Sequence, residues 1–127
     1  GLGHLDIVTT MTPQKTLSRV QAVHLASQAR VSGYEIHIGR SDGPDRAQPF
    51  ALVQGAPEGA ISCDGRVMGS YLHGMFAGDA FRAAFLTSLG QTTEIRAHGA
   101  EVEATLDALA AHIEAHLDVA GLLALAR

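Results

Sequence analysis

The sequence changes character near residue 78, and this change limits the folds that the chain can adopt. The first part is rich in β-branched residues, glycine and short polar breaks, whereas the last part is rich in Ala, Leu and Glu. Residues of the first kind favour strands and turns, and residues of the second kind favour helices. Strands followed by helices predict an α/β fold, a mixed sheet with helices packed on it.

The stretch 31–38 has the clearest strand pattern in the first part. Side chains alternate between the two faces of a strand, so Tyr34 and Ile36 share one face while Glu35 and His37 share the other. This alternation predicts an apolar face and a polar face on the same strand. Further strands are expected over 2–9, 16–25, 50–53 and 67–73.

Turn-forming residues separate the expected strands. Pro13 suits a turn before the strand at 16–25, and the segment 40–49 contains two Pro and one Gly and is expected to be a loop. Cys63 is followed by the dipeptide Asp64-Gly65, which favours a tight hairpin.

Two helices are expected in the second part. The first begins with Asp79 as its N-cap, has Phe81 and Phe85 at helical spacing, and stops at Gly90. A polar linker over 91–100 then leads to the second helix. An apolar stripe at spacings of four, three, four and four defines that helix: Val102, Leu106, Leu109, Ile113 and Leu117.

Length and charge exclude several classes of protein. A chain of 127 residues fits one domain, and a net charge of −4 without clustered basic residues argues against nucleic-acid binding. No apolar run approaches the ~18 residues of a membrane span. The single cysteine fits a reducing compartment, so we expect a cytoplasmic protein. The chain opens with Gly1 rather than Met, and we expect it to be a piece of something longer.

His73 is the histidine whose sequence context best suits chemistry. It ends an expected strand and is followed at once by Gly74, which places its imidazole at an open edge of the sheet. An imidazole can take up and return a proton near neutral pH. Together with Glu35 and His37 it would suit a divalent metal site, an acid–base cluster or a polar ligand patch, and composition does not choose among these.

The remaining reactive residues point to no further site. His112 and His116 are four residues apart on the second helix and are expected on a solvated face, although this spacing can bind a metal. Cys63 precedes Asp64, whose negative charge disfavours a thiolate, so we expect a structural or incidental role for this thiol. No glycine-rich phosphate loop is present, and no nucleotide cofactor is expected in this chain.

Three segments together resemble the C-terminal part of the cobyric acid synthase family. They are TTMTPQKT at 9–16, GYEIHIG at 33–39 and GRVMGSYLHGMF at 65–76. The resemblance extends from Gly1 to about Leu89, and we expect it to include the final helix. It implies that residues 1–127 are the C-terminal portion of a class I-like glutamine amidotransferase domain, whose fold is flavodoxin-like.

The resemblance also implies a function. The family hydrolyses glutamine through a Cys–His pair and passes ammonia to an ATP- and Mg-dependent synthetase domain, which amidates corrinoid carboxylates in cobalamin biosynthesis. His73 matches the family's catalytic histidine, and Glu35 and His37 are expected to be supporting polar residues, with Glu35 as the orienting partner of His73. The nucleophile elbow and the synthetase domain are not in this chain, so we expect the chain alone to be inactive.

Three alternatives remain open at this point. The first is a small metal-binding, β-rich enzyme that uses Glu35, His37 and His73. The second is a non-catalytic amidotransferase-like module that docks onto a partner chain. The third is a related amidotransferase of peptidoglycan precursors, against which the segment 9–16 argues. We expect glutamine and the rest of the synthase as partners, and an exposed sheet face would favour a homo-oligomer.

Overall fold

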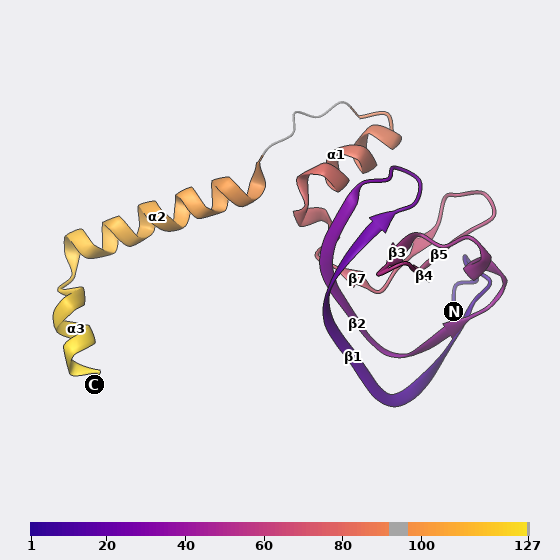
Figure 1. The fold of residues 1–127 in the computed structure, drawn as a ribbon, viewed down its shortest axis with the longest axis horizontal. Helices are drawn as coiled ribbons and strands as arrows, with labels where there is room; N and C mark the ends of the chain where they lie inside the picture. The colour runs from indigo at the N-terminus through magenta and orange to yellow at the C-terminus, as the bar shows by residue number, and fades with distance from the viewer. Residues whose placement is uncertain (92–96, 127) are drawn as a thin grey trace. The chain divides into compact units, whose positions relative to one another are not determined.

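The computed structural model describes residues 1–91 and 97–126, which fall into two compact units (Figure 1). The first unit, Gly1–Ile95, contains the strands and helix α1. The second unit, Arg96–Arg127, contains helices α2 and α3.

A long, curved hairpin forms the centre of the first unit (Figure 1). Its two strands lie in the middle of a five-stranded sheet of order β4-β3-β1-β2-β7, and a separate pair joins β5 to β6. Every pairing among these strands is antiparallel. The strands are β1 (Val8–His24), β2 (Arg30–Asp42), β3 (Ala51–Val53), β4 (Ala56–Glu58), β5 (Ala60–Ile61), β6 (Met68–Gly69) and β7 (Leu72–His73).

Strand β1 is longer than expected and continues through Pro13. The expected strand at 2–9 begins only at Val8, and no turn separates it from the strand at 16–25. The pairing with β2 shifts register between Thr10 and Lys15. A proline cannot donate to the ladder, and an irregularity of this kind is where a strand tolerates one. The prediction of a turn at Pro13 is therefore wrong.

The core of the first unit lies between the sheet and helix α1 (Asp79–Ser88). Phe81 and Val31 are 0% exposed. The ring of Phe81 meets those of Phe50 and Phe85 at centroid distances of 6.1 and 5.8 Å. The other buried members of the core are Val20, Ala22, Ala51, Val53 and Leu72.

Strand β2 alternates as predicted, but its polar face points inward. Glu35 and His37 are partly buried, whereas Tyr34 is 49% exposed and Ile38 is 46% exposed. Alternation places side chains on two faces, and the rest of the fold decides which face is covered.

The N-cap of helix α1 lies one residue before the expected Asp79. Gly78 is the N-cap, and Asp79 is the first helical residue, where its carboxylate pairs with Arg82 at 2.6 Å. The predicted stop at Gly90 is confirmed. Gly90 has a φ of 78°, and its N–H donates to the Thr87 carbonyl at 2.9 Å.

The second unit consists of α2 (His98–His116) and the short α3 (Val119–Leu125). Helix α2 starts inside the expected linker at 91–100, of which residues 92–96 lie outside the described part of the chain. Its apolar stripe is present but 40–56% exposed. Asp118 caps α3 by accepting from the Gly121 N–H at 2.9 Å.

Among the described residues, no helix taken singly has the length and apolarity to cross a membrane. The bent pair α2–α3 meets that test by length and composition alone.

The expected α/β class is confirmed, because the described residues combine a sheet with helices, but the sheet is antiparallel rather than mixed in every described pairing. Two 3₁₀ turns complete the described elements, η1 (Pro44–Ala47) and η2 (Met75–Ala77), and η1 lies in the predicted loop at 40–49. The predicted hairpin at Cys63 is also confirmed. It joins β5 to β6, with Gly65 at a φ of 70°.

Candidate functional site

His73 is the last residue of β7, at the outer edge of the five-stranded sheet. It pairs with Tyr34 of β2, and a Cβ at Gly33 would collide with the His73 carbonyl oxygen. Gly33 therefore lets β7 approach β2 closely. Gly74 follows with a φ of 76°, which turns the chain into η2.

The imidazole of His73 is exposed and makes no hydrogen bond or ion pair within the described residues. Its backbone is fixed by strand pairing, whereas both ring nitrogens remain available. An imidazole in this state can exchange protons with a group brought from outside these residues.

His37 is held from several sides. Its Nδ1 donates to the Gly39 carbonyl at 2.7 Å, and its Nε2 lies 3.4 Å from a Glu35 carboxylate oxygen. Its ring stacks on Tyr71 with centroids 4.2 Å apart. A side chain restrained in this way suits the wall of a site.

The sheet separates His73 from the pair formed by Glu35 and His37. Directly paired residues of an antiparallel ladder share a face, so His73 lies with Tyr34 and Leu72 lies with Glu35. The Glu35 carboxylate contacts His37, and within the described residues nothing joins it to His73. The same residues contain no group of three or more His, Cys, Asp or Glu side chains that could hold a metal ion.

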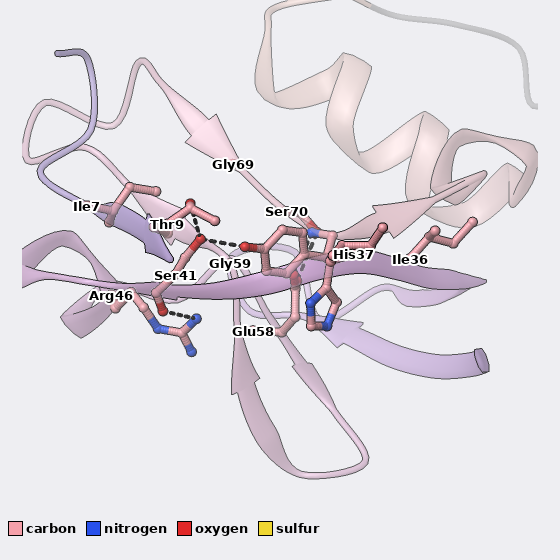
Figure 2. A pocket seen from close by; sticks show the side chains of 13 residues that line it. Ile7, Thr9, Ile36, His37, Ser41, Arg46, Glu58, Gly59, Gly69 and Ser70 are labelled. Atoms are coloured by element: carbon pink, nitrogen blue, oxygen red, sulfur yellow. Dashed lines mark hydrogen bonds between the residues drawn. The ribbon is translucent and has the colours of Figure 1, made fainter. Parts of the chain in front are cut away.

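A pocket of about 360 Å³ opens beside His37 (Figure 2). A chain of hydroxyl groups crosses it, in which Ser41 Oγ lies 2.6 Å from Thr9 Oγ1 and also contacts the Tyr71 hydroxyl. The Arg46 guanidinium donates to the Ser41 carbonyl at 3.3 Å. The pocket therefore combines polar groups with the apolar walls of Ile7 and Ile36.

Glu58 also lines this pocket, although its sequence does not predict a role there. It ends β4 and is 6% exposed, and its carboxylate accepts from Ser70 Oγ at 2.8 Å and from the Tyr71 N–H at 2.7 Å. A glutamate between Pro57 and Gly59 has the sequence of an exposed turn. No signal in the sequence marked its burial.

Cys63 is exposed in the turn between β5 and β6. Hydrogen bonds from the Ser62 hydroxyl and the Arg66 N–H lower the pKa of the neighbouring Asp64 carboxyl. Within the described residues no hydrogen bond or ion pair joins Cys63 to a base.

His24 is buried against aromatic rings. Its ring centroid lies 4.7 Å from that of Phe50 and 5.1 Å from that of Phe81, and burial lowers the pKa of the imidazole. Nδ1 accepts from the Ser27 N–H at 3.3 Å. His24 is therefore a structural residue of the core.

Comparison with protein families matches residues 1–81 to the CobB/CobQ-like glutamine amidotransferase domain. Among curated proteins, the chain is 64% identical to "Cobyric acid synthase" of Rhodobacter capsulatus and 66% identical to that of Cereibacter sphaeroides. It is 63% identical to that of Bradyrhizobium diazoefficiens. Each alignment covers 100% of this chain and 26% of the relative.

The chain thus spans about a quarter of the length of the curated relatives it matches. The resemblance to cobyric acid synthase predicted from the sequence is confirmed. No solved structure matches the chain.

Proposed function

This chain belongs to the CobB/CobQ-like glutamine amidotransferase domain family, and we propose on that premise that His73 is the general base of its glutaminase centre. One observation carries the proposal. The imidazole of His73 is exposed, and its ring has no partner among the described residues, while strand pairing fixes its backbone.

His73 would act as base, then as acid, and then again as base in glutamine hydrolysis. It takes the proton of a cysteine thiol, and the thiolate attacks the side-chain amide carbon of glutamine. When the tetrahedral intermediate collapses, the carbon–nitrogen bond breaks and the imidazolium gives its proton to the departing ammonia. Water then attacks the thioester carbon, His73 takes a proton from that water, and glutamate and the thiol are released.

The nucleophile of this reaction is proposed to be a cysteine outside the 127 residues. Cys63, the only cysteine of the chain, lies exposed in a turn beside the Asp64 carboxylate. A nearby negative charge disfavours a thiolate, and no base contacts the sulfur within the described residues. We therefore expect no glutaminase activity from the chain alone.

The wider function is proposed from the relatives, which are named cobyric acid synthase. Residues 1–127 would be the C-terminal portion of a flavodoxin-like glutaminase domain that supplies ammonia. A synthetase domain with ATP and Mg would use that ammonia to amidate corrinoid carboxylates in the cytoplasm. These relatives favour the corrinoid acceptor over a peptidoglycan precursor.

Glu35 and His37 are proposed as supporting residues of a neighbouring polar wall. They lie on the face of β2 opposite to His73, and Glu35 contacts His37 rather than the imidazole of His73. His37 is proposed to contact glutamine, ammonia or another domain. The alternative of a metal site at Glu35, His37 and His73 receives no support from the described residues, which contain no group of three or more His, Cys, Asp or Glu side chains that could hold a metal ion.

The test replaces His73 with Ala in a full-length protein that contains this chain. Glutamine-dependent amidation should fall by at least about 100-fold through loss of general acid–base catalysis, while amidation with free ammonia is spared. His4→Ala is the matched control, because His4 is an exposed histidine without a hydrogen bond or ion pair in the described residues. Equal loss with both nitrogen sources would contradict the role of His73.

A further inference from the structure

We propose that Glu58 is the positioning residue of the glutaminase centre and that it acts through the segment that ends in His73. The inference rests on the proposed function of His73. The structural arrangement that supports it is independent of that function, because it concerns how the sheet closes.

Glu58 connects the two outer strands of the sheet. It ends β4, which lies at one edge of the order β4-β3-β1-β2-β7, and its carboxylate binds residues directly before β7, at the other edge. These hydrogen bonds bring the two edges of the sheet together through one side chain. Figure 2 shows Glu58 and Ser70 in the wall of the pocket.

The Glu58 carboxylate replaces a backbone acceptor that a longer β5–β6 ladder would supply. Strands β5 and β6 pair Ala60 with Gly69, and continuing that register by two residues would set Glu58 opposite Tyr71. The backbone carbonyl of Glu58 instead accepts from the Phe50 N–H at 2.9 Å. Its side chain supplies the acceptor for the Tyr71 N–H at 2.7 Å.

From Glu58 the hydrogen bonds lead toward His73. Ser70 Oγ donates to the carboxylate at 2.8 Å and accepts from the Leu72 N–H at 3.0 Å. The peptide groups of Tyr71 and Leu72 are thus both tied to one buried charge, directly or through one hydroxyl. His73 is the next residue.

A buried carboxylate is well suited to this task. Hydrogen bonds to an ionised acceptor are shorter and stronger than those between neutral groups. A carboxylate that is 6% exposed must also keep its donors, because losing them leaves an uncompensated buried charge. The segment 70–72 is therefore held in one arrangement, and the Cα of His73 is held with it.

The experiment has a structural part on the 127-residue chain. Amide hydrogen exchange is measured by NMR in the wild type and in Glu58→Gln, Glu58→Ala and the exposed control Glu103→Gln. We expect the Tyr71 and Leu72 amides to exchange at least about tenfold faster in Glu58→Ala, with Glu58→Gln between the two and Glu103→Gln unchanged. The Phe50 amide, which donates to the Glu58 backbone, should stay protected and show that the fold is kept.

The catalytic part uses a full-length protein that contains this chain. Glu58→Ala should lower kcat for glutamine hydrolysis about 10- to 100-fold, because a misplaced base loses its orientation, while KM stays within about threefold. Glu58→Gln should restore part of kcat, because an amide oxygen still accepts from the Tyr71 N–H. Glu103→Gln should leave both constants unchanged.

Two results would overturn the inference. One is a folded Glu58→Ala in which the Tyr71 and Leu72 amides keep their protection. The other is faster exchange at these amides with an unchanged kcat. If the wild-type protein shows no glutaminase activity at all, the proposed function fails, and the exchange measurement still decides whether Glu58 holds this segment.

If Glu58→Ala does not fold, the variant Ser70→Ala still tests the inference. Ser70→Ala removes the acceptor of the Leu72 N–H but leaves the carboxylate with the Tyr71 N–H. It should speed exchange at Leu72 more than at Tyr71 and lower kcat less than Glu58→Ala. Unchanged exchange at Leu72 would overturn the inference as well.

Discussion

Helices α1 and α2 both carry apolar residues at helical spacing, but the two units cover these residues to different extents. In the first unit Phe81, from the periodic stripe of α1, is 0% exposed. In the second unit the stripe of α2 is 40–56% exposed, and no described residue of α2 or α3 is buried. Periodicity therefore defines a helix and its apolar face, whereas burial depends on what other elements place opposite that face.

The largest test of this comparison replaces one apolar side chain in each unit. Phe81→Ala should lower the free energy of unfolding of the first unit by about 3–5 kcal/mol, because it empties space among four aromatic rings. Leu109→Ala, at a position that is 52% exposed, should change stability by about 0.5 kcal/mol or less.

Urea unfolding followed by tyrosine fluorescence measures this difference. Both tyrosines, Tyr34 and Tyr71, lie in the first unit, so the signal reports on that unit. Far-ultraviolet circular dichroism at 222 nm follows the helices in parallel. Similar losses for the two substitutions would show that the stripe of α2 is buried in solution.

A second test places the same substitution, Gly→Ala, in both units with opposite expected signs. At Gly33 the new methyl group meets the His73 carbonyl oxygen, so β7 must move and the first unit should lose about 1–3 kcal/mol. At Gly99 nothing lies within 4 Å, and Ala should stabilise α2 by up to about 1 kcal/mol.

The loss of stability in Gly33→Ala is measured by urea unfolding followed by tyrosine fluorescence. The gain in Gly99→Ala is measured by thermal unfolding followed by circular dichroism at 222 nm. His73 offers a further check, because a shifted β7 changes the chemical shift of its backbone amide. A stable Gly33→Ala chain with an unmoved His73 amide would refute the close approach of β7 and β2.

The smallest expected effect is a dependence on pH that belongs to the first unit. Burial lowers the pKa of His24 below its ordinary value of 6.5, so the unfolded chain binds this proton more readily than the folded chain. The contribution of His24 to the free energy of unfolding is therefore fully present above pH 6.5. It is lost as the pH falls from there through the lowered pKa.

Urea midpoints at pH 7.5 and pH 5.5 measure this effect. His24→Gln, which does not titrate, should show a smaller drop between the two values than the wild type, whatever its own stability. His112→Gln in α2 is the control and should keep the wild-type drop. The same drop in His24→Gln as in the wild type would assign the pH dependence to other groups.

The sequence predicted those elements whose signals are local. The alternation over 31–38, the Asp64-Gly65 hairpin and the stop at Gly90 all describe a few neighbouring residues, and all are present. The predicted turn at Pro13 is wrong because the effect of a proline on a strand depends on how that strand pairs with its neighbour. A proline breaks a regular ladder but fits an irregular one, and the register shift between Thr10 and Lys15 is set by both strands.

The candidate site divides along the same line. His73 could be predicted from the sequence because the segment 65–76, in which a histidine precedes a glycine, is a local signal. Its catalytic role stays a prediction. The separation of His73 from Glu35 follows from the register of β7 on β2, which spacing does not supply. Glu58 was missed because its importance comes from residues 12 and 13 positions further along the chain.

The hydrogen bonds from Ser70 and Tyr71 to Glu58 also affect the tendency of the sheet edge to pair with other molecules. Unpaired N–H groups at a sheet edge are templates on which a strand from another molecule can add. Here the Tyr71 N–H, beside the edge strand β7, is already occupied by a buried carboxylate, and the edge strand β4 is continued by β5 toward β6. The Glu58 carboxylate thus opposes strand addition at this edge, since an invading strand would have to take the place of one of its donors.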